Sequence, residues 1–173
     1  TSPSEANQWY EYWKQFAMDF LVNLGISREN LRFRDHDADE LSHYSEGTVD
    51  IEYRFPWGFD EIWGIANRTN YDLTQHQNHS KSNMEYQDPY TNEKYIPYVI
   101  EPSVGVERLM LAFICEAYSQ EALEKETRTV MRFSPKLAPV KVAVLPLSKK
   151  LGENAQEVWS TLSEHFETDY DES

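Results

Sequence analysis

The run Glu-Pro-Ser-Val-Gly-Val-Glu-Arg at residues 101–108 places groups that can bind charged ligands just before an apolar segment. The apolar segment, residues 109–114, predicts a helix over about residues 104–118, with Arg108 in its first turn. The N–H groups of a first turn carry roughly +0.5 elementary charge, which disfavours a guanidinium there. An anionic or electron-rich ligand would remove this conflict, and Gly105 leaves the helix N-terminus open to one.

Three segments, in order along the chain, resemble glycyl-tRNA synthetases, which belong to the class II aminoacyl-tRNA synthetases. Residues 101–108 resemble the third signature motif of class II in its Glu-Pro-Ser-x-Gly form. Residues 57–73, Trp-Gly-Phe-Asp-Glu-Ile-Trp-Gly-Ile-Ala-Asn-Arg-Thr-Asn-Tyr-Asp-Leu, resemble the strand that precedes this motif. Residues 137–147 resemble the entry to the anticodon-binding domain. The resemblance implies activation of glycine with ATP and transfer to tRNA-Gly by a homodimeric enzyme.

The resemblance also implies site residues. The residues expected at glycine are Glu101, Pro102, Ser103, Val104 and Gly105, and those expected at ATP are Glu61, Ile62, Gly105, Val106, Glu107 and Arg108. Glu101 would bind the ammonium group, and Arg108 would stack on adenine and contact the phosphates. Glu61 would help to hold Mg²⁺ between phosphates.

Each of these roles has a structural alternative. Glu101 could cap the following helix, and Arg108 could form an ion pair with Glu107 or Glu101. Glu61 could pair with Arg68 on the same segment.

Other candidate residues carry weaker signals. Trp63 and Tyr98 are candidate walls of a glycine pocket, although aromatic side chains on strands are more often core. His76, His79 and Asp72 share a predicted helix, but their spacing fits no common zinc motif, so no metal site is predicted. The remaining residues considered are His36 and His43, expected at the surface or as caps, and Cys115, expected as inert core.

Composition indicates a globular protein of the cytoplasm. The 173 residues are 40% hydrophobic and lack an apolar run of the roughly 20 residues that a membrane span needs. One cysteine and the absence of a secretory signal fit a reducing compartment. A net charge of −14 argues against a broad basic surface for nucleic acid, so tRNA contacts are expected on a local patch elsewhere.

Hydrophobic periodicity predicts an α+β fold. A helix over residues 5–24 carries an apolar stripe of Trp9, Trp13, Phe16, Phe20 and Leu24, and ends at Gly25. The strands expected next cover residues 30–34, 49–55, 59–66 and 94–101, with a helical turn at 39–44 and a helix plus insertion within 69–90. In the strand over 59–66, alternation puts Glu61 on one face with Phe59, Trp63 and Ile65.

The chain is expected to contain two parts. Residues 1–136, an antiparallel sheet flanked by helices, would be the C-terminal portion of a class II catalytic domain, with a linking strand near residues 130–133. Residues 137–173, with a strand at 141–147 and a helix at 154–166, would be the truncated start of an α/β anticodon-binding domain.

The first and second class II motifs are not visible in the sequence. Residues 32–35, Arg-Phe-Arg-Asp, resemble the second motif only superficially, because aspartate replaces its glutamate. An internal fragment that is inactive alone is therefore expected. Two other functions stay open, namely a non-catalytic synthetase-like binding module and a class II ligase for another amino acid, such as threonine, proline or serine.

Overall fold

The computed structural model describes residues 1–37 and 46–172 of the chain. The chain forms two compact units, Thr1–Met131 and Arg132–Ser173, each considered by itself. The expected division lies after residue 136, and the assignment of the two parts to a catalytic and an anticodon-binding domain stays a prediction. The predicted turn of helix at 39–44, together with His43, lies outside the described residues.

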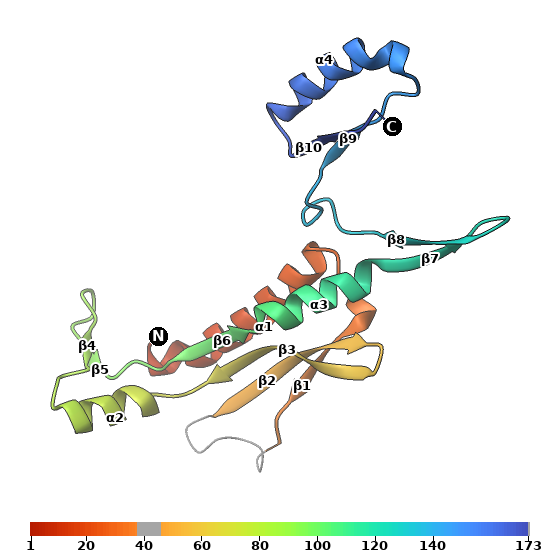
Figure 1. The fold of residues 1–173 in the computed structure, drawn as a ribbon. Helices are drawn as coiled ribbons and strands as arrows, with labels where there is room; N and C mark the ends of the chain where they lie inside the picture. The colour runs from red at the N-terminus through yellow and green to blue at the C-terminus, as the bar shows by residue number, and fades with distance from the viewer. Residues whose placement is uncertain (38–45, 173) are drawn as a thin grey trace. The chain divides into compact units, whose positions relative to one another are not determined.

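The first unit is built on a four-stranded antiparallel sheet (Figure 1). The sheet contains β1 (Leu31–Asp35), β2 (Gly47–Phe55), β3 (Gly58–Asn67) and β6 (Ile100–Val104), in the order β1-β2-β3-β6. Two helices, α1 (Ala6–Asn23) and α3 (Val106–Ala117), pack on one face of this sheet. This arrangement confirms the predicted antiparallel sheet with flanking helices.

Alternating side chains of β2 separate an apolar face from a polar one. Val49, Ile51 and Tyr53 point into the core that α1 and α3 cover. Asp50 and Glu52 point to the opposite face, which we call the polar face. The predicted alternation of β2 is therefore confirmed, and it sets which side of the sheet can present charged groups.

A β-bulge in β3 changes which face its first residues occupy. Ile51 pairs with Trp63, whereas the next residue, Glu52, pairs with Glu61, so Ile62 is an extra residue on β3. Directly paired residues project to the same face, so Glu61 lies on the polar face while Trp63 lies in the core. The expectation that Glu61 shares a face with Trp63 and Ile65 is wrong, because simple alternation cannot include a bulge.

The apolar stripe predicted for α1 is also displaced. The buried residues of this helix are Ala6, Tyr10, Ala17, Met18 and Leu21. Trp9, Phe16 and Phe20, expected in the core, have 45, 41 and 38% of their surface exposed. Smaller side chains fill the space next to the sheet, and the large rings lie beside it in edge-to-face and stacked contacts with one another. The end of the helix before Gly25 is as predicted.

The remaining elements of the first unit connect these layers. They are the 3-10 helices η1 (Pro3–Glu5) and η2 (Arg28–Asn30), α2 (Tyr71–Ser80), and the hairpins β4 (Tyr86–Gln87) with β5 (Lys94–Tyr95) and β7 (Tyr118–Ala122) with β8 (Thr127–Met131). The strand predicted over 94–101 is thus divided between β5 and β6. The strand β7 was not predicted, whereas β8 overlaps the linking strand expected near residues 130–133.

In the described part of the second unit, one α-helix connects two parallel strands. Its elements are β9 (Val142–Val144), the 3-10 helix η3 (Lys149–Leu151), α4 (Gly152–Ser163) and β10 (Thr168–Tyr170), with β9 and β10 parallel. The strand and helix predicted here are confirmed, although each is shorter than expected. β10 was missed and completes a β-α-β connection. Among the described helices of both units, none combines the length and apolar character that crossing a bilayer requires.

Candidate ligand-binding face

The polar face of the sheet brings together residues from β3 and β6 that are far apart in sequence. Gly64 pairs with Ser103, and Ala66 pairs with Glu101, so these four residues project to one face. The bulge at Ile62 brings Glu61 to the same face. Three of the predicted site residues, Glu61, Glu101 and Ser103, therefore share one surface.

Other predicted residues do not present side chains to this face. Pro102 pairs with Ile65 and Val104 pairs with Trp63, so their side chains project to the helix-covered face. The side chain of Ile62 is buried in the core. Only the backbone of these three site residues is available to a ligand on the polar face.

Of the two candidate wall residues, Trp63 packs into the core. Its ring lies edge to face with that of Phe20, with ring centroids 5.7 Å apart, and its surface is buried. Trp63 therefore does not line the polar face, although the sequence had made it a candidate wall residue. The role of Tyr98 as a wall stays a prediction.

Arg108 reaches from the first turn of α3 to the beginning of β3. Its Nη1 donates a hydrogen bond to the backbone carbonyl of Glu61 at 2.8 Å and lies 3.5 Å from Oδ1 of Asp60. Arg108 and Asp60 have 55% and 45% of their side chains exposed, so the pair is not buried. Neither Glu107 nor Glu101 is its partner, contrary to the structural alternatives considered above. Asp60 was not anticipated, because nothing in the sequence indicates that it faces α3.

The guanidinium of Arg108 makes its contacts in the plane of the group, and its side chain is half exposed. All guanidinium N–H groups point outward in the plane of the group, and the contacts with Asp60 and with the Glu61 carbonyl are both made by Nη1. The planar faces are the surfaces that stack on an aromatic ring. The helix begins after Gly105, and no side chain in the described part of the chain caps its N-terminus. An anion or an aromatic ligand is compatible with this arrangement.

Glu101 is held by Arg68 at the end of β3. Arg68 Nη1 donates to Oε2 of Glu101 at 2.7 Å, and Arg68 Nε donates to Oδ2 of Asp72 at 2.6 Å. The hydrogen bond from Arg68 lowers the pKa of the Asp72 carboxyl. Arg68, considered above as a partner for Glu61, thus connects Glu101 to α2. Asp72, considered with His76 as a metal ligand, instead binds this arginine.

The segment that superficially resembles the second motif forms ion pairs within the sheet. Arg32 Nε donates to Glu52 Oε2 at 2.6 Å, and Arg34 lies 3.7 Å from a carboxylate oxygen of Asp50. His36, expected at the surface or as a cap, lies 2.7 Å from the same aspartate. Both carboxylates are buried, so the two arginines compensate charge on β2. Alternation could have placed both acids on the polar face, but it does not predict their partners.

Glu116 joins α3 to two other parts of the first unit. Its carboxylate accepts hydrogen bonds from the backbone N–H of Ser27, from Nδ2 of Asn30 and from the hydroxyl of Tyr53, each at 2.9 Å. Burial alone would raise the pKa of Glu116, but the hydrogen bonds from these donors outweigh burial and lower it. Burial and the bond to Glu116 raise the pKa of Tyr53. These bonds fix the helix that carries Arg108.

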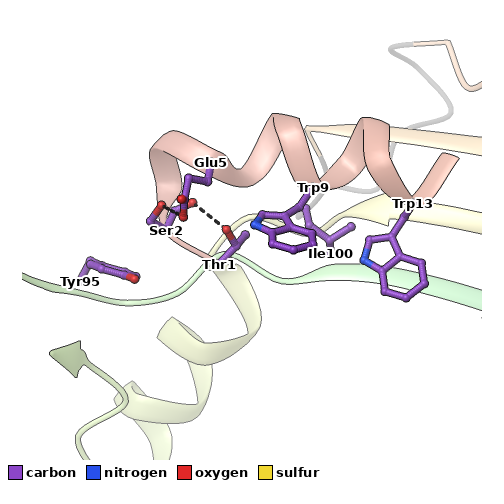
Figure 2. A pocket seen from close by; sticks show the side chains of 7 residues that line it. All are labelled: Thr1, Ser2, Glu5, Trp9, Trp13, Tyr95 and Ile100. Atoms are coloured by element: carbon purple, nitrogen blue, oxygen red, sulfur yellow. Dashed lines mark hydrogen bonds between the residues drawn. The ribbon is translucent and has the colours of Figure 1, made fainter. Parts of the chain in front are cut away.

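A cavity of about 410 Å³ lies away from the predicted residues (Figure 2). Its walls include Trp9 and Trp13 of α1, Tyr95 of β5 and Ile100 of β6. At its rim, the hydroxyl of Ser2 donates to the Glu5 carboxylate at 2.6 Å. None of the residues expected to bind glycine or ATP lines this cavity, so it is not part of the candidate site.

Comparison with known proteins identifies relatives over nearly the whole chain, although no family model matches. The glycine–tRNA ligase of Caldanaerobacter subterraneus subsp. tengcongensis is 61% identical over 171 residues, and that of Staphylococcus epidermidis is 58% identical over 173. The glycine–tRNA ligase of Alkaliphilus oremlandii is 56% identical over 172 residues. Each match covers 99% of this chain, and the chain spans 37% of the length of each relative.

A solved structure supports the fold. The prolyl-tRNA synthetase of Giardia lamblia, determined in complex with prolyl-adenylate, matches all of this chain and 34% of its own with a TM-score of 0.66. At 15% sequence identity this likeness bears on the fold alone. The sequence matches, in contrast, are all to ligases for glycine, and they confirm the resemblance predicted from residues 57–73, 101–108 and 137–147. Across 99% of its residues, the chain is thus homologous to a segment of the glycine–tRNA ligases, which are class II aminoacyl-tRNA synthetases.

Proposed function

We propose that this chain is part of a glycine–tRNA ligase and supplies groups that bind glycine and ATP during formation of glycyl-adenylate. The observation that carries the proposal is the gathering of Glu61, Glu101 and Ser103 on one face of the sheet, with Arg108 at its rim. The high identity to glycine–tRNA ligases favours glycine over another amino acid. Transfer of the glycyl group to tRNA-Gly belongs to the same proposed function.

Glycine would be bound through its two charged groups. The carboxylate of Glu101 is 45% exposed and suits the ammonium group, and the exposed hydroxyl of Ser103 lies on the same face. Arg68 divides its hydrogen bonds between Glu101 and Asp72, so one oxygen of Glu101 keeps acceptor capacity for the substrate. The backbone of Pro102, Val104 and Gly105 would complete this wall.

ATP would lie at the start of α3. The planar faces of the Arg108 guanidinium suit adenine, and the backbone N–H groups after Gly105, in Val106 and Glu107, suit phosphate oxygens. Glu61 has an exposed carboxylate, and hard oxygen ligands of this kind fit Mg²⁺ when phosphate oxygens and water supply the other ligands. A bound Mg²⁺ would neutralise phosphate charge during attack on the α-phosphate.

The remaining assignments concern the intact protein. Residues 1–136 would belong to its catalytic domain and residues 137–173 to the start of its anticodon-binding domain, for which the β9-α4-β10 arrangement is support. A homodimer in the cytoplasm is expected from the family. The net charge of −14 implies that most tRNA contacts lie outside this segment.

The test is glycine-dependent exchange of pyrophosphate into ATP by the full-length protein that contains this chain. Glu101→Ala should raise the KM for glycine, and Arg108→Ala should raise the KM for ATP, each by about tenfold or more because a charged hydrogen bond is lost. Glu124→Ala, in the exposed turn after β7, is the control and should behave as wild type.

Two outcomes would contradict the proposal. Wild-type kinetics in both site variants would overturn the residue assignments. Absence of glycine-dependent exchange in the wild-type full-length protein would favour a non-catalytic binding module or a ligase for another amino acid. The 173-residue chain alone is expected to show no exchange, since it spans only 37% of its relatives.

A further inference from the structure

Gly64 lies at the centre of a row of residues that crosses the polar face. Gly64 pairs with Asp50 on β2 and with Ser103 on β6. A residue without a side chain therefore lies between a carboxylate on one side and a hydroxyl on the other. In the next row along β3, Ala66 pairs with Glu101. Gly64 and Ala66 therefore leave the middle of the polar face with little side-chain volume, beside Ser103 and Glu101, which are proposed to bind glycine.

The backbone of Gly64 does not require glycine. The glycines with positive φ in the described residues are Gly25 and Gly58, and Gly64 is not among them. A glycine inside a strand costs stability because it adds conformational entropy to the unfolded chain and packs no side chain. A common reason to keep glycine there is that another group approaches the backbone closely. The bulge at Ile62, two residues earlier, does not place Gly64 in a strained conformation.

Two carboxylates border the space above Gly64. A Cβ atom built on Gly64 would lie 3.4 Å from Oε1 of Glu61 and 3.6 Å from Oδ1 of Asp50. A single methyl group at this position would therefore fill the gap between the acids. The same space suits a small group with positive charge, since both bordering oxygens accept hydrogen bonds.

We propose that Gly64 is a specificity-determining residue, which forms the floor of the glycine pocket and leaves room for the substrate's α-carbon and ammonium group. This inference rests on the proposed function. A larger amino acid offers more contact area, so it is rejected only where its side chain meets occupied space. Between Glu61 and Asp50, the room above Gly64 is that of about one carbon centre, and an added methyl on either enzyme or substrate competes for it.

The test is Gly64→Ala in the full-length ligase, assayed by pyrophosphate exchange with glycine and ATP varied separately. We expect the KM for glycine to rise by about tenfold or more, the range for one added methylene in a pocket, and the KM for ATP to rise less, because the new Cβ would be at ordinary contact distance from Glu61. Gly47→Ala on the neighbouring strand is the matched control. The atoms nearest to its Cβ would be those of the Tyr10 side chain, at an ordinary contact distance of 3.6 Å, on the helix-covered face.

The outcomes separate this inference from the proposed function. An unchanged KM for glycine in Gly64→Ala, or an equal rise for glycine and ATP, overturns the inference, while the loss of glycine use in Glu101→Ala still supports the function. If Gly64→Ala unfolds at a much lower temperature than Gly47→Ala, Ser103→Thr replaces it, because threonine keeps the hydroxyl and adds a methyl group from the opposite strand. Ser103→Thr should also raise the KM for glycine alone, and wild-type values would overturn the inference.

Discussion

The two faces of the four-stranded sheet bury different kinds of side chain, apolar on one face and charged on the other. On the helix-covered face, Val49, Ile51 and Ile65 are completely buried, and burial of apolar surface stabilises this side. On the polar face, Asp50 and Glu52 are also buried, but arginines of β1 lie beside both carboxylates, and His36 lies 2.7 Å from Asp50. One face therefore holds the fold together, and the other keeps charged groups in fixed positions.

The largest effect is expected where the helix-covered face is broken. Ile51→Ala should lower the free energy of unfolding by about 2–5 kcal/mol, because it removes buried methyl groups and leaves a cavity under α1 and α3. Urea unfolding measures this loss. Val22→Ala, at a position of α1 that is 38% exposed, is the control and should stay within about 0.5 kcal/mol of wild type. A loss below 1 kcal/mol for Ile51→Ala would show that this face is less tightly packed than described.

A smaller, pH-dependent effect is expected at Glu116, a residue of α3, which is one of the helices that cover the apolar face of the sheet. The pKa of this carboxyl is lowered in the folded state, so its contribution to stability is present above the unfolded pKa, about 4.3, and is lost as pH falls through the folded pKa. The unfolding free energy of wild type should therefore exceed that of Glu116→Gln at pH 7, and the difference should shrink below about pH 4.

Urea unfolding at several pH values measures this difference, with Glu124→Gln as a control that removes an exposed carboxylate. A gap between wild type and Glu116→Gln that stays constant from pH 7 to pH 3 would mean that the three hydrogen bonds do not depend on the ionised form.

The smallest effect is expected on the polar face. Arg32→Met keeps the apolar stem of the side chain and removes its bond to Glu52, while Arg34 remains 4.0 Å from that carboxylate. Because Arg32 is half exposed, the loss of unfolding free energy should be about 1 kcal/mol or less. A loss as large as that of Ile51→Ala would show that the two faces contribute equally to stability.

Local patterns predicted those parts of the fold that depend on neighbours in sequence. Alternation identified β2, and the apolar segment after residue 108 identified α3, because both periods are read within one element. The partners of Arg108 and Glu116 could not be predicted in this way. Asp60 is 48 residues from Arg108, and Ser27 is 89 residues from Glu116, so the contacts exist only after the strands pair.

The aromatic residues of α1 misled the prediction for a related reason. Periodicity identified a helix, but it could not decide which of two adjacent stripes faces the sheet. The chosen stripe held the largest rings, such as Trp9 and Phe16, whereas Ala17 and Leu21 fit the narrow space against β3. Hydrophobicity alone ranks side chains by size, but packing selects them by the room available.

The extra residue in β3 has a consequence for protein engineering. Deleting Ile62 would restore uninterrupted pairing and remove a buried side chain, while Glu61 would stay opposite Glu52 on the polar face. The extra residue thus allows Glu61 and Trp63, which are two residues apart in sequence, to project to opposite faces of the sheet. An alignment with a relative that lacks the bulge therefore keeps both halves of β3 in register if its gap lies at residue 62, whereas a gap at another residue of this strand assigns some side chains to the wrong face.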